Sequence, residues 1–264
     1  MLVNNIVAVV IPMYNCADTI DKVLDSIRCQ TKLDLIKYVI LINDGSTDNT
    51  LEVVGNYSSS LPLKIIDKVN GGVASARNEG LKHIDDAEFV AFCDSDDLWL
   101  PNKIEEQLRV FIEHPEIDVL GGPFNNNPLR IGLKVISSLH KATVKEMLIR
   151  NYPQPSTVLM RSSVYHKFGG FDETQRYAED GNYFLKLAAN CNLYYYPHLL
   201  IKFGFGKRGF GGTGLSGNLK GMYEGNIKNL KEMKKLNYIS IPFYFSMRLF
   251  HWLKYLRRVI ISTL

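Results

Sequence analysis

Three carboxylates stand within four residues of one another, at Asp94, Asp96 and Asp97, directly after the apolar run of residues 89–92. Like charges this close repel one another unless a cation holds them, and a divalent metal that bridges to a phosphate is the simplest such cation. An acidic turn that caps a helix starting near Pro101 explains the same residues. The segment by itself therefore leaves a metal site and a capping turn as equal alternatives.

A second acidic pair, Glu179 and Asp180, stands just before a segment that has helical character from Gly181 onward. A carboxylate at such a point can act as a general base that takes a proton from an attacking hydroxyl. It can also be an acidic helix N-terminus that the helix dipole stabilises. The two roles are compatible, and the sequence does not choose between them.

The elements that must position these side chains alternate along the first half of the chain. Continuous apolar runs, typical of strands that are buried on both faces of a sheet, occupy residues 6–11, 38–42 and 89–92, and a further strand is predicted at residues 63–66, which include Lys64. Apolar residues at helical spacing predict helices at residues 17–31, 50–57 and 73–83. This alternation predicts an α/β fold with a mostly parallel central sheet and helices on both faces, with Pro12 ending the first strand.

In such a sheet, ligands bind beyond the carboxyl ends of the strands. Polar residues follow each predicted strand, and we expect them to converge on one edge: Tyr14, Asn15, Asp44, Asn70 and Asp94. Beyond about residue 120 the alternation weakens, which predicts a less regular half up to about residue 203.

Composition excludes several classes of protein. With 264 residues, of which 46% are hydrophobic and 22% charged, the chain can bury a full core and is too apolar to be disordered. Its four cysteines have no paired spacing and its six histidines are far from them in sequence, so we expect no zinc site. The N-terminus has no basic start and no cleavage site of a secretory signal, and the expectation is a reduced cytoplasmic protein.

Charge is distributed unevenly along the chain. Residues 202–264 hold twelve Lys and Arg residues against two Glu residues, whereas the rest of the chain has an acidic surplus. The basic surplus suggests an appended module that faces an anionic partner. Within it, residues 204–217 hold seven glycines with Lys207 and Arg208, which predicts a mobile loop that closes over a diphosphate or is simply solvated.

The last residues predict a helix at 219–236 and then an aromatic and basic segment at 239–261. The uncharged run at 236–247 has twelve residues, fewer than the ~20 needed to span a bilayer. The segment could bind an anionic membrane surface, bind a nucleic acid or pack on the main domain. No nucleic-acid-binding module is present and the rest of the chain is acidic, so a nucleic-acid partner is not expected. A membrane surface and simple packing remain as alternatives.

Six sequence blocks occur in a fixed order, which makes their combination far more specific than any one of them. They are VVIPMYN at 9–15, NDGSTD at 43–48, NGGVASARN at 70–78, DSDD at 94–97, GGFDE at 169–173 and YAED at 177–180. Over roughly residues 5–200 the chain resembles the family-2 nucleotide-sugar glycosyltransferases, which have the GT-A fold. One departure is Asn43, where that family often has a second aspartate.

The resemblance implies roles for the residues near the donor. Pro12, Tyr14 and Asn15 would hold the base, and Asp44 would bind the uracil imide, although an Asp-Gly-Ser turn alone would favour a turn residue. Asn70 and Arg77 would lie near the nucleotide and its phosphates, and Asp94 would face the ribose. Asp96 would bind Mn²⁺ or Mg²⁺ on the diphosphate, with Asp97 as a weaker candidate for either role.

The resemblance also implies that Asp180 is the general base of an inverting transfer and that Glu179 supports it. Ser156, Thr157 and Arg161 are placed as in relatives that build bacterial surface polysaccharides, where this region borders the acceptor. A strand edge followed by a turn explains those three residues at least as well.

The expected organisation is a GT-A catalytic domain at 1–203, with a nucleotide-binding half at 1–120 and an acceptor half at 121–203. A glycine-rich loop at 204–218 and a helical extension at 219–264 follow, with 238–264 on an anionic membrane surface. The expected activity is metal-dependent transfer from a UDP-sugar to a polyprenyl-diphosphate-linked saccharide of bacterial O-antigen or capsule synthesis, at the inner face of the cell membrane. A nucleotidyltransferase or a non-catalytic sugar-binding scaffold of the same fold are the alternatives.

Overall fold

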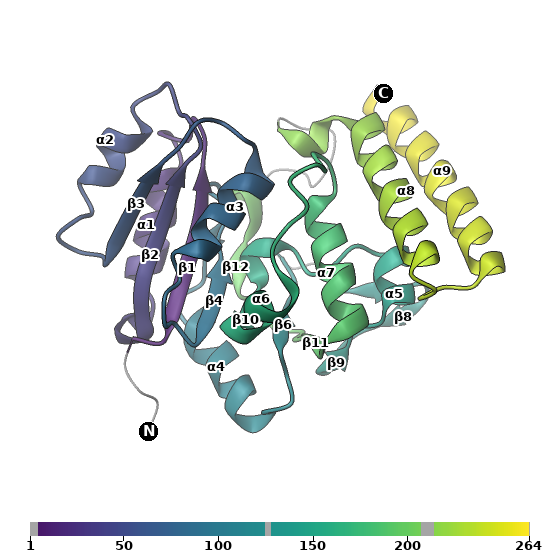
Figure 1. Ribbon diagram of the computed structural model, residues 1–264, viewed down its shortest axis with the longest axis horizontal. Coiled ribbons are helices and arrows are strands. Elements are labelled where there is room, and N and C mark those ends of the chain that lie inside the picture. Colours follow the sequence, from purple (N-terminus) through teal and green to yellow (C-terminus); the bar gives the residue numbers. More distant parts are fainter. Residues whose placement is uncertain (1–4, 125–127, 207–213, 264) are drawn as a thin grey trace.

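The computed structural model describes residues 5–124, 128–206 and 214–263, and it is built around one eight-stranded sheet (Figure 1). In spatial order the strands are β3 (Leu63–Asp67), β2 (Ile36–Asn43), β1 (Val7–Met13), β4 (Phe89–Phe92), β10 (Leu159–Arg161), β6 (Val119–Gly121), β11 (Leu193–Tyr195) and β9 (His140–Lys141). The first four are parallel to one another. β10 and β9 run antiparallel to their neighbours, while β11 is parallel to β6. The expected mostly parallel sheet is confirmed.

The first strand continues through Pro12, so the expectation that Pro12 ends it is wrong. Proline has no N–H to donate, which normally excludes it from a central strand. Here the Cys93 N–H donates to the Val10 carbonyl, so alternate residues of β1 face β4, and pairing with β4 stops at Val10. Pro12 therefore faces the side where β1 has no remaining strand partner, while the Asp44 N–H still bonds to the Met13 carbonyl on the other side.

Helices cover both faces of the sheet, as expected (Figure 1). Two hydrophobic clusters lie on opposite faces, because successive side chains of β1 point to opposite sides. One cluster packs α1 (Ile20–Arg28), α2 (Thr50–Gly55) and α4 (Lys103–Glu113) on the sheet. The other packs α3 (Val73–Lys82), α5 (Val144–Ile149), α6 (Ser162–Phe168) and α7 (Glu179–Asn190). The helix predicted at 17–31 is shorter in the structure.

The second half is less regular, as its sequence predicts. β10 enters the sheet antiparallel between β4 and β6, a reversal that the periodicity of the sequence did not indicate. Two short antiparallel strand pairs lie outside the central sheet. β12 (Ile201–Lys202) pairs with β5 (Leu98–Trp99), and β7 (Arg130–Ile131) pairs with β8 (Lys134–Val135). The β12–β5 pair brings the chain back beside the acidic turn at residues 94–97.

Two long helices, α8 (Leu219–Lys235) and α9 (Ile241–Thr263), form a hairpin at one side of the molecule (Figure 1). Ile227, Leu230 and Met233 of α8 and Tyr244 and Met247 of α9 belong to the same buried cluster as α3 and α7. The hairpin therefore packs on the body of the protein through one face. Within the ranges given above, no helix has both the length and the apolar character that crossing a bilayer requires.

Close packing of α3 on β1 depends on Gly80, where an added Cβ would lie 2.4 Å from the Val10 Cγ1 atom. We expect Gly80→Ala to lower the free energy of unfolding by about 1–3 kcal/mol, because an overpacked core must shift to make room. Gly55→Ala is the matched control, since nothing lies within 4 Å of a Cβ built there. Urea unfolding of both variants measures the difference, and equal stability of the two would contradict the packing argument.

Candidate functional site

The loops that follow β1 and β2 meet at the carboxyl edge of the sheet, as expected. The Asn15 N–H donates to Ser46 Oγ at 3.0 Å, and the Thr47 N–H donates to Asn15 Oδ1 at 2.8 Å. Asn15 adopts a left-handed φ of 46°, a conformation that asparagine tolerates better than most residues. Beside it the Tyr14 side chain is 54% exposed, whereas Pro12 is buried in the strand. Tyr14 and Asn15 are therefore the accessible members of this group.

Asp44 lies in a cradle made by the segment after β3. Its Oδ1 accepts from Lys68 Nζ at 2.7 Å and from the Gly71 N–H at 2.9 Å, and its Oδ2 accepts from the Gly72 N–H at 2.8 Å. Asn70 donates to the Asp44 backbone carbonyl at 2.8 Å. A carboxylate has about four acceptor positions, so three donors leave one position on Oδ2, in a side chain that is 4% exposed.

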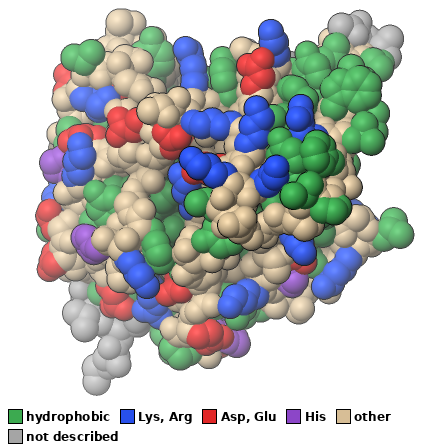
Figure 2. Space-filling view, turned by 45° about the vertical axis from the view of Figure 1, so that its right-hand side comes forward, with side chains coloured by type: hydrophobic (Ala, Val, Ile, Leu, Met, Phe, Trp, Pro, Cys, Tyr) green, Lys and Arg blue, Asp and Glu red, His purple; other side chains and the backbone are tan. Residues whose placement is uncertain are grey.

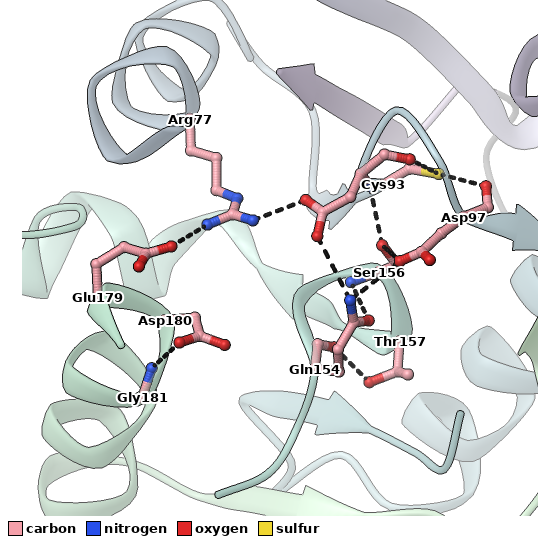
Figure 3. Close-up of polar contacts among 10 residues, drawn as sticks. Arg77, Cys93, Asp97, Gln154, Ser156, Thr157, Glu179, Asp180 and Gly181 are labelled. Atoms are coloured by element: carbon pink, nitrogen blue, oxygen red, sulfur yellow. Dashed lines mark hydrogen bonds and ion pairs between the residues drawn. The ribbon is translucent and has the colours of Figure 1, made fainter. Parts of the chain in front are cut away.

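Arg77 is the centre of the site (Figure 3). Its side chain is 4% exposed, and it donates from Nη2 to Asp94 Oδ1 at 2.7 Å and from Nη1 to Glu179 Oε1 at 3.0 Å. Glu179 is 102 residues away in sequence. One buried guanidinium therefore joins the acidic turn after β4 to the acidic pair at the start of α7.

The charges around Arg77 explain how a buried cation is tolerated. Burial acts to lower the pKa of Arg77, but the negative charges of Asp94 and Glu179 outweigh it and raise that pKa above the usual value. Its Nε has no hydrogen-bond partner within the described part of the chain. Arg77 is thus held by carboxylates of this chain, whereas the resemblance expects it near the nucleotide phosphates.

The segment at residues 154–157 makes hydrogen bonds to the acidic turn at residues 94–97 and holds it in place (Figure 3). Ser156 Oγ donates to Asp97 Oδ2 at 2.5 Å and accepts from the Asp94 N–H at 2.9 Å. Gln154 Nε2 donates to Asp97 Oδ2 at 3.0 Å, and the Gly204 N–H donates to Asp97 Oδ1 at 2.7 Å. Asp97 is fully buried, and burial together with the nearby charge of Asp94 raises its pKa to about 7.

Asp94 and Asp96 are the partly exposed carboxylates of the turn. Across the described residues, no three His, Cys, Asp or Glu side chains gather to bind a metal by themselves. A cation that also binds a diphosphate needs only one or two carboxylates from the protein. Hard carboxylate oxygens suit Mg²⁺ and Mn²⁺. Asp96 is partly exposed and can reach a bound cation, whereas Asp97 is fully buried.

Glu179 and Asp180 begin α7. Burial and the neighbouring charge of Asp180 raise the pKa of Glu179 to about 7, although Arg77 opposes this. Burial also raises the pKa of Asp180, against the opposing effects of Arg77 and of the Gly181 N–H, which donates to Asp180 Oδ1 at 2.7 Å. Figure 3 shows the Asp180 carboxylate pointing from the start of α7 toward the side where Gln154 lies. Asp180 is only partly buried, which suits a carboxylate that must reach a substrate.

The three residues expected near the acceptor are engaged in other contacts. Ser156 and Thr157 are fully buried, and Thr157 Oγ1 donates to the Gln154 carbonyl. Arg161 pairs in register with Phe89, at the start of β4, whereas the acidic turn follows the end of that strand. Arg161 donates to the carbonyls of Ile117 and Pro115 there. Ser156 thus supports the acidic turn, and Arg161 is at the opposite edge of the sheet.

Lys207 and Arg208, expected to close over a diphosphate, lie outside the described residues.

Two residues of the site were missed by the sequence analysis. Gln154 bridges Asp94 and Asp97, and no local pattern marks it. Lys68 follows β3 at the carboxyl edge, and that position could have indicated it.

Comparisons with known proteins identify the family and the fold. The model of the family described as glycosyl transferase family 2 matches residues 8–160. An uncharacterized glycosyltransferase of Rickettsia typhi is 28% identical over 205 residues, which cover 75% of this chain and 63% of that protein. Chondroitin synthase of Pasteurella multocida is 40% identical over 109 residues, covering 41% of this chain and 11% of the synthase. The chain thus spans less than two thirds of these relatives.

Solved structures share the fold. S. aureus TarS in complex with UDP-GlcNAc superposes with a TM-score of 0.69 at 23% identity, covering 86% of this chain and 66% of that one. The mannosyltransferase PcManGT from Pyrobaculum calidifontis, in complex with GDP-Man and Mn²⁺, gives a TM-score of 0.68 at 17% identity, covering 96% of this chain and 70% of that one. The expected GT-A fold is confirmed. The family model covers more than half of the chain, and the chain therefore belongs to glycosyl transferase family 2.

Proposed function

We propose that this protein transfers a sugar from a UDP-sugar to a hydroxyl of a saccharide acceptor, with inversion at the anomeric carbon. The observation that carries the proposal is the double ion pair of Arg77, which holds Asp94 at the carboxyl edge of the sheet and Glu179 at the start of α7 in one site. Asp180 follows Glu179 directly, so the same contact brings a candidate base to the edge where nucleotides bind in such folds.

Asp180 would act as the general base. Its carboxylate takes the proton of the acceptor hydroxyl while that oxygen attacks the anomeric carbon, and the bond from this carbon to the diphosphate oxygen breaks with both electrons going to UDP. The raised pKa of Asp180 makes its carboxylate a stronger base than an exposed aspartate. Glu179, which is bound to Arg77, would orient the turn without reaching the substrate.

Asp44, Asn15 and Tyr14 would bind the donor base. The remaining acceptor position on Asp44 Oδ2 suits an imide N–H of uracil, and the exposed ring of Tyr14 can lie against a base. Asn70 and Asp94 would line the ribose side. Structures of TarS with UDP and UDP-GlcNAc support a uridine donor, whereas the GDP-Man complex of PcManGT makes a guanosine donor the competing outcome.

Asp96 would bind Mn²⁺ or Mg²⁺ together with the donor diphosphate. Such a cation, when bound, neutralises charge on the leaving group. The Mn²⁺ in the PcManGT complex supports a metal requirement. Asp97 has a different role in this proposal, because its hydrogen bonds to Ser156, Gln154 and Gly204 fix the turn that presents Asp94 and Asp96. Arg161 has no part in the proposed site.

The outer face of α9 would lie on an anionic membrane. Seven large apolar side chains that are 37–59% exposed recur at helical spacing, and they are Ile241, Phe245, Leu249, Trp252, Leu253, Leu256 and Ile260. We call these residues the α9 stripe. Residues 241–263 contain no Asp or Glu, while the exposed Arg248 and Arg257 lie one on each side of the stripe. An exposed apolar stripe beside basic residues is typical of helices that lie in a membrane interface.

Figure 2 shows apolar side chains gathered on the side of the molecule where α8 and α9 lie, with Lys and Arg side chains beside them. Basic residues near an anionic leaflet each contribute about 1 kcal/mol of binding. A protein held at the inner face of the cell membrane in this way would meet a polyprenyl-diphosphate-linked saccharide directly. That acceptor, and a place in bacterial O-antigen or capsule synthesis, complete the proposal.

The alternative enzyme class is a nucleotidyltransferase, which would have a glycine-rich phosphate loop after the first strand. Here β1 is followed by Tyr14 and Asn15, and the family model supports sugar transfer instead. A sugar-binding scaffold of the same fold would bind the donor without consuming it, and the first experiment below separates the two.

Replacing Asp180 by asparagine removes the base but keeps the shape of the side chain. We expect Asp180→Asn to lower UDP release from a UDP-sugar by about 100-fold or more, which is the usual contribution of a general base. UDP affinity, measured by calorimetry, should stay within about twofold, because Asp180 would contact the acceptor side. The pH profile of the wild type should rise with pH, since the ionised carboxylate is the active form.

Glu52→Gln, an exposed carboxylate of α2, is the matched control and should keep full activity. UDP-GlcNAc, UDP-glucose and GDP-mannose are tested as donors in parallel. Full activity of Asp180→Asn would remove the proposed base. No release from any donor by the wild type would favour the scaffold.

Metal dependence is tested by titrating UDP into the protein with Mn²⁺ and then with EDTA. We expect EDTA to weaken UDP binding at least about tenfold, because the diphosphate loses its cation. Asp96→Ala should weaken binding in Mn²⁺ to a similar degree and be insensitive to EDTA. Asp18→Ala, an exposed carboxylate at the same edge, should bind as the wild type does. Equal UDP affinity of Asp96→Ala and wild type in Mn²⁺ would exclude Asp96 as the ligand.

The membrane surface is tested by sedimentation with phosphatidylcholine vesicles that do or do not contain phosphatidylglycerol. The wild type should bind only the anionic vesicles, and added salt should weaken that binding. The double variant Phe245→Asp, Leu249→Asp should bind at least about 100-fold more weakly, because two exposed apolar side chains that would enter the membrane interface are replaced by charged ones. Leu133→Asp is the control, since Leu133 is fully exposed on the β7–β8 turn. Equal binding of the double variant and the control would rule out the α9 stripe.

A further inference from the structure

The turn that leads into Glu179 and Asp180 has an unusual backbone. Ala178 is the N-cap of α7 and adopts a left-handed conformation, with φ 55° and ψ 32°, and its side chain makes no capping hydrogen bond. A residue with a Cβ seldom takes this conformation unless its surroundings impose it. Something other than local preference must therefore hold the turn in place.

Three buried amide side chains surround this turn. Asn229 Nδ2 donates to the Ala178 carbonyl at 2.9 Å, and Gln175 Nε2 donates to the same carbonyl at 3.1 Å. Gln175 and Asn182 both donate to Asn229 Oδ1, at 2.8 Å and 3.2 Å. Gln175, Asn182 and Asn229 are each at most 4% exposed. Asn229 belongs to α8, so the hydrogen bonds that hold the turn come partly from the helical hairpin.

The backbone of α8 also approaches the turn closely. A Cβ at Gly225 would lie 2.2 Å from the Tyr177 carbonyl oxygen, and a Cβ at Gly221 would lie 2.6 Å from the Tyr177 ring. Gly221, Gly225 and Asn229 are spaced four residues apart and therefore share one face of α8. That face fits the Tyr177 ring and the Tyr177 backbone, and Asn229 is its hydrogen-bonding member.

We propose that Asn229 is a positioning residue, which sets the place of the Asp180 carboxylate by holding the Ala178 carbonyl from α8. The inference rests on the proposed function, because it assigns Asn229 an effect on transfer through the proposed base. Ala178 is two residues before Asp180, so a rotation of its peptide would displace the carboxylate. A displacement of about 1 Å at a reacting group can cost about 100-fold in rate.

The test measures UDP release and UDP binding on the same preparations, with the UDP-sugar that the wild type consumes fastest. Asn229→Ala should lower UDP release per UDP-binding site by about 10- to 100-fold, while the UDP affinity stays within about twofold. The side chain in Asn229→Asp keeps nearly the same shape as that of the asparagine it replaces. Its protonated carboxyl can donate to the Ala178 carbonyl and its ionised form cannot, so we expect its rate relative to wild type to fall as pH rises.

Glu224→Ala, an exposed residue of the same helix, is the matched control and should behave as the wild type does. Unchanged release per UDP-binding site in Asn229→Ala would overturn the inference. A second result would also overturn the inference. If UDP release in both Asn229 variants falls only in proportion to the number of UDP-binding sites, Asn229 has a role in folding alone. If Asp180→Asn is fully active, the proposed base fails. If it is inactive while both Asn229 variants keep full activity per site, only the positioning role fails.

Discussion

The site depends on one buried cation between two carboxylates. Transferring a guanidinium out of water is unfavourable unless its charge is paired and hydrogen-bonded, and Asp94 and Glu179 provide both for Arg77. The pairing also acts in the other direction, because Arg77 stabilises the negative charge of the buried Glu179 and of the partly buried Asp94. Two acidic segments from distant parts of the chain are thereby fixed to one another at the edge of the sheet.

The same contact bears on the expectation that Arg77 binds phosphate. A guanidinium whose Nη1 and Nη2 both donate to carboxylates has its charge balanced within the chain. Its effect on a diphosphate would therefore act through the organisation of Asp94 and its turn more than through direct contact. Lys68, directly after β3, is similar, since its ammonium is bound to Asp44. Arg77 and Lys68 each bind and orient carboxylates, and these carboxylates are the functional groups of the site.

Much of the fold could be predicted because the first half of the chain follows a simple rule. Each apolar β-branched run became a parallel strand, and the residues after each strand met at one edge, as Asn15, Asp44 and Asp94 show. The prediction for Pro12 was wrong, because a strand residue needs an N–H only where a neighbouring strand pairs with it, and the sequence does not show which strand lies beside β1 or in what register. The reversed β10 and the buried Ser156 and Thr157 failed for a related reason. Their surroundings come from strands that are distant in sequence.

Gln154 and Asn229, two residues whose roles the sequence did not reveal, have one physical feature in common. Gln154 reaches Asp97 across 57 positions and Asn229 reaches the Ala178 carbonyl across 51, and each is an uncharged amide that would pass for a surface residue. An amide gains its role only when burial leaves a backbone carbonyl or a carboxylate in need of a donor. Around Asn229, burial of that kind exists because α8 packs on the turn before α7 through Gly221 and Gly225. The helical hairpin is thus part of the architecture of the acidic site on one face, while its other face presents the α9 stripe to the surroundings.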